Sequence, residues 1–418
     1  MQHYIERHAD SRLSELVSAF PALLLTGPRG CGKTTTAVRH AASVIRLDVE
    51  AQATAFSGGP DAILRTAERP VLIDEWQRVP SSLGALKRAV DDDYSAGQFL
   101  VTGSVRSRYV ADAWPGTGRL LPVRLWGLTQ AEMRGRAEVT LEWLWQPDAI
   151  RPRLASGAPD VVAYTEFALA GGFPEAFALA PNRRPAWYRG YVESLVDRDV
   201  TSLLDVRSPG GLRRLFDAVA ANSAGQPAVA HLADAAHIDQ RTATLYLDVL
   251  EDMRIIQRVR PWFHNRMSRL VKAPKYYMTD TGLMAGLCRV SAKTVLSDGD
   301  LLGRMIDTLV AAQVRPLADL SEPPVDVFHG RDTQGRFEVD LILESPERGL
   351  VGVEVKAAAA VSAHDARHLA RLRDQVPDEF VAGYVFHTGP GVFPLGERLW
   401  AVPIAALWQP EIALGEAS

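Results

Sequence analysis

The chain has 418 residues, with 46 basic and 50 acidic side chains and a formal net charge of -4. This balance excludes a uniformly basic coat for nucleic acid but permits a local basic face. The hydrophobic content of 47% is typical of a globular protein, and the length predicts two or three domains at about 150 residues each. No apolar run is long enough to span a bilayer, and residues 1–7 lack the pattern of a signal peptide. Two cysteines, Cys31 and Cys288, cannot form a disulfide framework, so we expect a cytoplasmic protein without membrane contact.

The first motif along the chain is a glycine-rich loop between a predicted strand at residues 22–25 and a predicted helix from residue 35. It matches the pattern G-x-x-x-x-G-K-[ST] with Gly27, Pro28, Arg29, Gly30, Cys31, Gly32, Lys33 and Thr34, and Thr35 follows. Its glycines allow backbone amides and a helix start to point at phosphate oxygens. We expect Lys33 to hold the β- and γ-phosphates and Thr34 to hold Mg²⁺. The alternative is a glycine-rich turn with an incidental lysine.

A second apolar strand, residues 71–73, ends in Asp74 and Glu75 as a Walker B strand does. Asp74 is expected to bind Mg²⁺, directly or through water, and Glu75 to polarise the attacking water. Parallel strands bring their carboxyl ends to one edge of a sheet, where open α/β sheets bind ligands. The pair of motifs therefore favours a nucleotide site over an incidental turn.

The next predicted strand, residues 98–104, ends in the hydroxyl side chains Thr102 and Ser104. Its place after the Walker B strand favours a sensor near the γ-phosphate, and the alternative is a serine-capped turn. Arg119 follows a glycine-containing stretch and is a candidate arginine finger, in the same chain or towards a neighbouring subunit. The alternative for Arg119 is a solvated loop arginine. A homo-oligomer is left open.

The pattern along the chain divides it into three predicted domains. Residues 1–150 alternate strand and helix patterns, which predicts a P-loop NTPase domain with a parallel α/β sheet. A stretch rich in proline, alanine and glycine at residues 146–160 is a candidate linker. We expect a helical region at 151–290 and a C-terminal α/β domain at 291–418.

The helical region contains a pattern typical of a winged helix-turn-helix. Two short helices, 229–236 and 240–253, flank a turn, and strands at 255–260 and 275–278 would border the wing. The second helix begins with side chains that are able to contact DNA. The wing region supplies a run of basic residues: Arg258, Arg260, Arg266, Arg269, Lys272 and Lys275. This run predicts a phosphate-contacting face, and the alternative is a winged helix that packs against protein.

The C-terminal domain carries carboxylates on a predicted β-hairpin, residues 336–343 and 350–356. The period of a strand places Glu354 and Lys356 on one face, and Asp340 can join Glu354 if the faces coincide. Two carboxylates beside a lysine suit metal-assisted phosphodiester hydrolysis, with a second Mg²⁺ or Mn²⁺ site. A preceding helix would add Asp307 to this site. The alternative is a nuclease-like fold kept for binding or scaffolding.

Together these segments resemble a family of bacterial and archaeal AAA-type ATPases with a C-terminal domain of unknown function. The resemblance rests on the phosphate loop and on residues 73–80, 102–104, 171–175, 275–282, 338–340 and 354–356, and it spans nearly the whole chain. It implies ATP as the nucleotide, a winged helix, a PD-(D/E)xK-like nuclease fold and work on DNA. The chain departs from the family pattern at Asp307, where glutamate is usual, at Trp76, where a smaller aliphatic residue is usual, and at Val339, where proline is usual.

The sequence thus predicts a Mg²⁺-dependent ATPase that couples its nucleotide state to DNA binding, with a metal-dependent nuclease or its binding-only relative at the C-terminus. One alternative is a nucleotide-dependent regulatory switch whose winged helix and C-terminal domain bind protein. Another is an endonuclease that uses ATP only to assemble.

Overall fold

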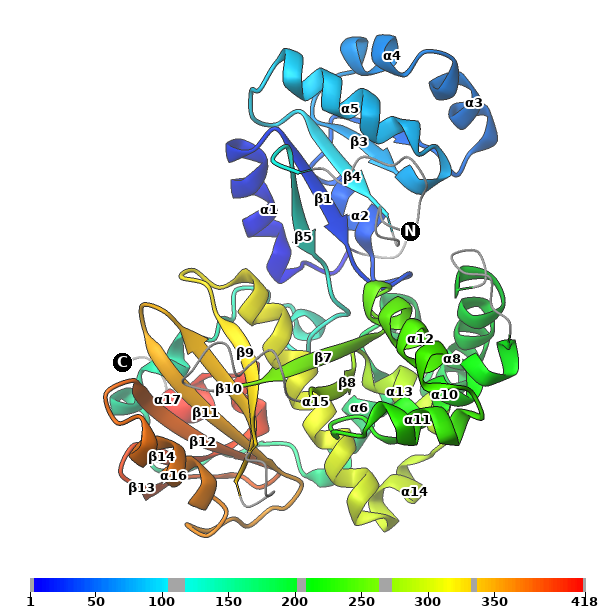
Figure 1. Cartoon of the computed structure of the whole chain (residues 1–418). Coiled ribbons are helices and arrows are strands. Elements are labelled where there is room, and N and C mark those ends of the chain that lie inside the picture. Colours follow the sequence, from blue (N-terminus) through cyan, green and yellow to red (C-terminus); the bar gives the residue numbers. More distant parts are fainter. Residues whose placement is uncertain (1–3, 104–116, 201–207, 263–272, 332–336, 416–418) are drawn as a thin grey trace.

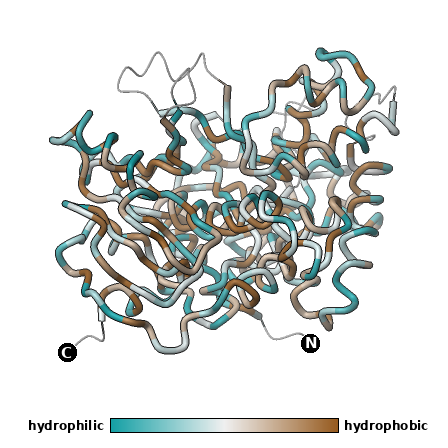
Figure 2. Tube along the Cα trace, turned by 90° about the horizontal axis from the view of Figure 1, so that it is seen from below, coloured by the Kyte–Doolittle hydropathy of each residue, from teal (hydrophilic) through white to brown (hydrophobic). Residues whose placement is uncertain are grey.

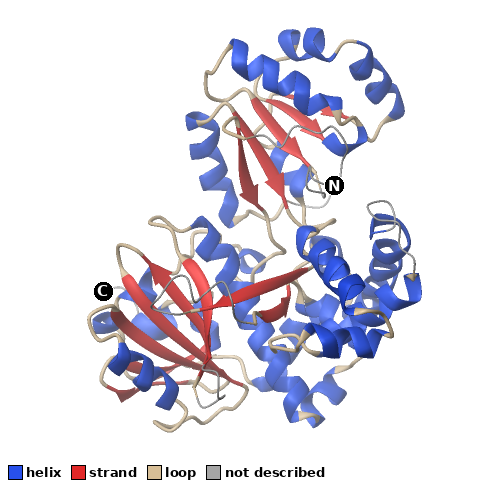
Figure 3. Ribbon diagram, in the orientation of Figure 1, coloured by secondary structure: helices blue, strands red, loops and turns tan. Residues whose placement is uncertain are grey.

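The computed structural model describes residues 4–103, 117–200, 208–262, 273–331 and 337–415 (Figure 1). These residues form a five-stranded sheet and a nine-stranded sheet. Figure 3 shows the first sheet at the top, the second at the lower left and a group of helices at the lower right. Coloured by hydropathy, the chain shows many hydrophobic stretches in the middle of the molecule and hydrophilic stretches along its edge (Figure 2). Within the described ranges, no helix has the length and apolar character needed to cross a bilayer.

The N-terminal sheet is parallel throughout and has the strand order β2-β3-β4-β1-β5. Its strands are β1 (Ala22–Thr26), β2 (Ser43–Arg46), β3 (Val71–Asp74), β4 (Phe99–Thr102) and β5 (Leu120–Arg124). The predicted parallel α/β sheet is therefore confirmed. Because all five strands point the same way, the ends of β1, β3 and β4 lie together at one edge.

Helices cover both faces of this sheet, since alternate strand residues point to opposite sides. On one face, α1 (His8–Ala19) and α2 (Lys33–Val38) pack on Leu23, Leu25, Leu72 and Leu100. The other face carries α3 (Glu50–Gly58), α4 (Pro60–Thr66) and α5 (Ser81–Asp92). This two-sided burial explains why the strands are almost entirely apolar.

The helical region surrounds a short antiparallel pair, β7 (Ile256–Pro261) and β8 (Lys275–Met278). Its helices are α6 (Val161–Ala170), α7 (Pro174–Phe177), α8 (Arg184–Ser194), α10 (Pro209–Ala221), α11 (Val229–Ala236), α12 (Gln240–Asp252), α13 (Thr281–Cys288) and α14 (Ala292–Ser297). The two helices and two strands expected at 229–278 are all present.

The second sheet has the order β6-β13-β14-β12-β11-β10-β9-β7-β8. Its remaining strands are β6 (Arg153–Leu154), β9 (Asp326–Arg331), β10 (Glu338–Ser345), β11 (Gly349–Lys356), β12 (Phe380–His387), β13 (Gly391–Gly396) and β14 (Leu399–Pro403). The predicted hairpin is confirmed, because β10 and β11 pair antiparallel with Leu341 opposite Val353. The long helix α15 (Gly299–Leu320) covers one face of this sheet and α16 (Arg367–Gln375) covers the other.

The helical region and the C-terminal domain share a sheet and a core. Strand β7 pairs in parallel with β9, with Arg260 opposite Phe328, and Figure 1 shows it reaching from the helical region to that sheet. One hydrophobic cluster includes buried residues from Ala131 to Ala413. The boundaries predicted at residues 150 and 290 stay predictions, and the chain on the two sides of residue 290 forms one packed unit.

Candidate functional site

The phosphate loop lies between β1 and α2, at the carboxyl edge of the N-terminal sheet. A side chain at Gly27 would collide with the carbonyl of Leu125, and Gly32 has a φ of 100°, so both positions require glycine. Lys33 is buried, and its Nζ donates to the carbonyl oxygens of Gly27 at 3.0 Å and Pro28 at 2.9 Å. The lysine therefore lies inside the curve of its own loop.

Asp74 joins the three predicted nucleotide elements. The hydroxyl of Thr34 donates to Asp74 Oδ1 at 2.7 Å, and the hydroxyl of Thr102 donates to the same oxygen. Thr102 is also 3.4 Å from the backbone nitrogen of Glu75. A hydroxyl and a carboxylate are the hard oxygen ligands that Mg²⁺ prefers, so Thr34 and Asp74 fit this ion.

Glu75 has an unusual backbone conformation, with φ 56° and ψ 48° in the left-handed region. A non-glycine residue in this region is strained, and such residues are concentrated at functional sites. The side chain of Gln77 donates to the Glu75 carboxylate. The strained turn thus brings Glu75 to the end of β3, next to Asp74.

Ser104 and Arg119 are the two remaining candidates for the nucleotide site. Ser104 lies outside the described residues. Arg119 precedes Leu120, which pairs with Ala22 at the start of β1, so it lies at the amino edge of the sheet, opposite the phosphate loop. There its Nε donates to Asp91 at 2.7 Å. The expectation that Arg119 acts within its own chain is therefore wrong for this conformation, and a role towards a neighbouring subunit stays a prediction.

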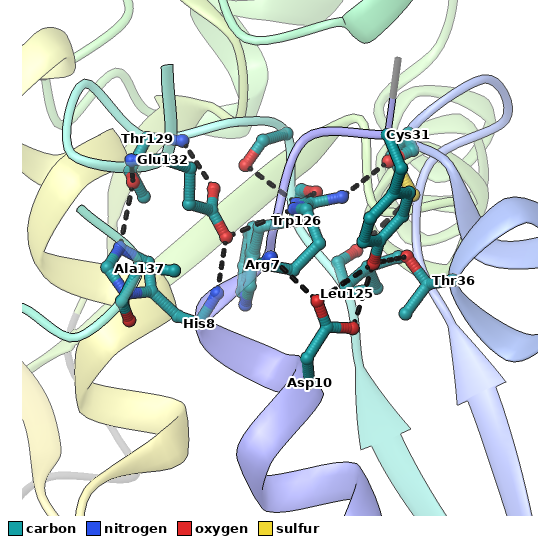
Figure 4. Close-up of polar contacts among 12 residues, drawn as sticks. Arg7, His8, Asp10, Cys31, Thr36, Leu125, Trp126, Thr129, Glu132 and Ala137 are labelled. Atoms are coloured by element: carbon teal, nitrogen blue, oxygen red, sulfur yellow. Dashed lines mark hydrogen bonds and ion pairs between the residues drawn. The ribbon is translucent and has the colours of Figure 1, made fainter. Parts of the chain in front are cut away.

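Arg7, a buried arginine that no sequence motif indicated, hydrogen-bonds to the phosphate loop. Arg7 donates to the carbonyl of Cys31 at 3.0 Å, to the carbonyl of Trp126 at 2.7 Å and to Glu132 Oε1 at 3.0 Å (Figure 4). Glu132 also accepts from the backbone nitrogens of His8 and Thr129. Arg7 therefore links the phosphate loop to the segment that leaves β5.

The helical region contacts the tip of the phosphate loop. The hydroxyl of Tyr191 in α8 donates to the carbonyl of Arg29 at 3.0 Å. A Cβ at Gly30 would lie 3.8 Å from Phe173, which packs on Tyr191 with ring centroids 4.8 Å apart. Phe173 belongs to the segment 171–175 on which the family resemblance rests. This segment therefore lies against the nucleotide site.

Asp280, in the family motif at residues 275–282, hydrogen-bonds to the segment 171–175. Asp280 is buried, and its Oδ2 accepts from the backbone nitrogen of Gly172 at 2.5 Å. Its Oδ1 accepts from the nitrogen of Leu283 at 2.7 Å and so caps α13. Burial raises the pKa of Asp280. Its role is structural, since both carboxylate oxygens are used by the backbone.

The structure describes three of the six basic residues in the predicted wing. Lys275 is 1% exposed, which excludes it from a surface that contacts phosphates, so that prediction is wrong. Arg258 is half-buried and forms ion pairs with Asp248 and Glu251. Arg260 is exposed, whereas Arg266, Arg269 and Lys272 lie outside the described residues.

The ammonium group of Lys275 lies between two of the predicted metal ligands. Its Nζ is 2.7 Å from Asp307 Oδ2 and 2.8 Å from Asp340 Oδ1. The hydroxyl of Tyr277 donates to Asp307 Oδ1 at 2.9 Å. This corrects the predicted ligand set, because Asp307 and Asp340 already neutralise an internal cation. The described residues contain no group of three or more His, Cys, Asp or Glu side chains placed to hold a metal.

Glu354 and Lys356 do share a strand face, as predicted. Lys356 Nζ donates to Glu354 Oε1 at 2.8 Å. Burial, together with the nearby Asp340 charge, raises the pKa of Glu354 to about 8. Burial also raises the pKa of Asp307 to about 7, against the attraction of Lys275. The structure thus brings the predicted C-terminal residues together, but as a buried charge network.

Comparisons with known proteins find three family models and two curated relatives along the chain. Family models match an AAA domain at residues 19–134, a domain of unknown function (DUF8612) at 162–294 and another (DUF4143) at 302–407. Two curated relatives, uncharacterized protein Rv2008c of Mycobacterium tuberculosis and uncharacterized protein Mb2031c of Mycobacterium bovis, are each 30% identical over 404 residues. The match covers 95% of this chain and 83% of each relative. The Walker-type ATPase PABY2304 of Pyrococcus abyssi is 15% identical, with 69% of this chain and 96% of that one covered and a TM-score of 0.38. The AAA match confirms the P-loop class of the first domain.

Proposed function

The chain belongs to the same family as these two mycobacterial proteins, and we propose that it is a Mg²⁺-dependent ATPase whose nucleotide state is transmitted to the attached helical region. The observation that carries the proposal is the convergence of Thr34 and Thr102 on Asp74, beside the buried Lys33. These residues come from three separate strand ends, and their types match each part of a phosphoryl-transfer site.

Each residue has a distinct task in this proposal. Lys33 exchanges its two loop carbonyls for the β- and γ-phosphates of ATP. Thr34 and Asp74 would hold Mg²⁺, which would supply positive charge to the phosphate oxygens. Thr102 keeps Asp74 oriented. Glu75 leaves Gln77 and accepts a hydrogen bond from the attacking water.

The contact between α8 and the loop supports transmission to the helical region. Tyr191 donates to the carbonyl of Arg29, and Phe173 lies against Gly30. Phosphates bound at the backbone amides of this loop would change the backbone positions of Arg29 and Gly30. A change of nucleotide would therefore shift the contact that α8 makes with the AAA domain.

The test is phosphate release from ATP with and without Mg²⁺, comparing the wild type with Lys33→Ala and Glu75→Gln. We expect Lys33→Ala to lose ATP binding and Glu75→Gln to bind ATP but to hydrolyse it about 100-fold more slowly or worse. Lys87→Ala is the matched control, since Lys87 lies on the surface of α5 in a pair with Asp91. Hydrolysis that Glu75→Gln leaves unchanged would refute the assigned role.

DNA is the partner that we propose for the helical region. The first turn of α12 exposes Gln240 and Arg241, and Arg260 is exposed on β7. These side chains suit phosphate and base contacts. The double variant Gln240→Ala/Arg241→Ala should weaken salt-sensitive DNA binding, while Arg65→Ala, an exposed arginine on α4, should not. Absence of DNA binding at low salt, or hydrolysis indifferent to single- and double-stranded DNA, would instead favour a switch that acts on protein.

A further inference from the structure

We propose that Lys275 is the resident cation of the C-terminal carboxylate site, and that the site holds this ammonium group in place of a divalent metal. The inference does not depend on ATP hydrolysis. It concerns Asp307, Asp340 and Glu354, which the nuclease-like pattern would assign to a metal.

All four oxygens of the two aspartates already accept a hydrogen bond from the protein. Asp307 accepts from Tyr277 through Oδ1 and from Lys275 through Oδ2. Asp340 accepts from Lys275 through Oδ1 and from the backbone nitrogen of Val355 through Oδ2, at 2.9 Å. A metal between the two aspartates would have to displace the buried ammonium group, because Lys275 Nζ occupies that position and would repel a divalent cation.

The charges of the group are nearly balanced without any added ion. Glu354 Oε1 accepts from Lys356 at 2.8 Å, so three carboxylates face two ammonium groups. Glu354 Oε2 is buried and is the one oxygen of these three carboxylates that has no hydrogen-bond partner among the described residues. Mg²⁺ or Mn²⁺ bound between the aspartates would lie against the Lys275 ammonium group, which is 2.7 Å from Asp307 and 2.8 Å from Asp340.

Lys275 cannot leave this position by a simple side-chain rotation. Its side chain is 2% exposed, and its backbone forms β8 at the end of the nine-stranded sheet. Its partners lie on two other elements, α15 and β10. The ammonium group therefore also joins the helical region to the C-terminal domain. Removing one member of this buried ion network would leave an uncompensated charge and destabilise the protein.

The test is a Mn²⁺ titration without nucleotide, read by the electron paramagnetic resonance of free Mn²⁺ and by thermal unfolding. We expect the wild type and Asp340→Asn to bind the same amount of Mn²⁺, because Asp340 holds none. We expect Lys275→Met to unfold at a lower temperature and to gain one Mn²⁺ site. At 100 times its dissociation constant, Mn²⁺ should raise the melting temperature of Lys275→Met by about 3 °C.

The double variant Lys275→Met/Asp340→Asn should lose that gain, which separates the new site from any Mn²⁺ at the phosphate loop. A wild-type Mn²⁺ site that disappears in Asp340→Asn would overturn the proposal. A folded Lys275→Met that binds no additional Mn²⁺ would overturn it as well. If Lys275→Met does not fold, the comparison of wild type with Asp340→Asn still decides between the two outcomes.

Discussion

Arg7 and Glu132 form a buried ion pair, with Nε and Oε1 3.0 Å apart and both side chains at most 4% exposed. The pair joins the start of α1 to the segment that follows β5. Since Arg7 also donates to the carbonyl of Cys31, the ion pair holds the phosphate loop in position (Figure 4).

Arg7→Ala should therefore destabilise the protein by about 3–5 kcal/mol, because it leaves the Glu132 carboxylate buried without its cation. The matched control is Arg12→Ala in the same helix. Arg12 pairs with the exposed Glu15 and Glu322, so its removal should cost at most about 1 kcal/mol. Urea denaturation of both variants checks this, and equal losses would contradict the structural role of Arg7.

The AAA domain could be predicted from the sequence because the motifs that indicate it are local. The phosphate loop and the Asp74–Glu75 pair each occupy consecutive positions, and parallel strands bring their ends together. Arg7 could not be predicted in this way. Its partners Cys31, Trp126 and Glu132 are 24 to 125 residues away along the chain, so only the fold brings them together.

Two errors had signals that the sequence did contain. Arg119 stands before a parallel strand, and such a residue lies at the amino edge, away from the loop. Lys275 and Tyr277 are two positions apart on a strand, so they share one face. Because Tyr277 has a large aromatic ring, burial of the face that it shares with Lys275 could have been expected. The basic residues nearby in the sequence suggested instead that Lys275 lies on the protein surface. Local composition misled the prediction because burial depends on the strand's place in the sheet.

Gly103 is predicted to tolerate no side chain, because it contacts the residues around Glu75. A Cβ there would lie 2.6 Å from Cδ1 of Trp76 and 2.7 Å from Oε1 of Gln77. Gly103→Ala should push Trp76 and Gln77 aside and so distort the turn that positions Glu75, which should slow ATP hydrolysis about 10-fold and cost about 1–3 kcal/mol.

Gly84→Ala is the control for that substitution. Gly84 lies within α5, and the atom nearest to its added Cβ is Nη1 of Arg88, at 3.6 Å. It should be neutral or stabilising by up to about 1 kcal/mol, since alanine favours a helix. Phosphate release and thermal unfolding measure both variants, and similar behaviour of the two would refute the steric argument.

Asp280→Ala should cost about 2–4 kcal/mol. The substitution removes the cap of α13 and leaves the buried backbone nitrogen of Gly172 without an acceptor. Asp239→Ala is the matched control, because Asp239 caps α12 through Thr242 from an exposed position and should cost about 1 kcal/mol. Chemical denaturation compares the two, and an equal cost would mean that the Gly172 contact contributes nothing.

The free energy of unfolding should depend on pH through Glu354. Burial and the Asp340 charge raise its pKa from 4.5 to about 8. A raised pKa in the folded state means that folding favours the protonated carboxyl group. Its contribution to stability is therefore fully present below pH 4.5 and is lost as the pH rises to about 8.

Glu354→Gln keeps an acceptor for Lys356 but cannot ionise. Relative to the wild type, the variant should gain about 2 kcal/mol or more between pH 5 and pH 8, since each unit of pKa shift corresponds to about 1.4 kcal/mol. Glu347→Gln is the control, because this glutamate is exposed in the turn between β10 and β11. Denaturation midpoints at several pH values measure the difference. If the midpoints of the wild type and of Glu354→Gln change with pH in the same way, Glu354 ionises as easily in the folded chain as in the unfolded one, and the prediction is wrong.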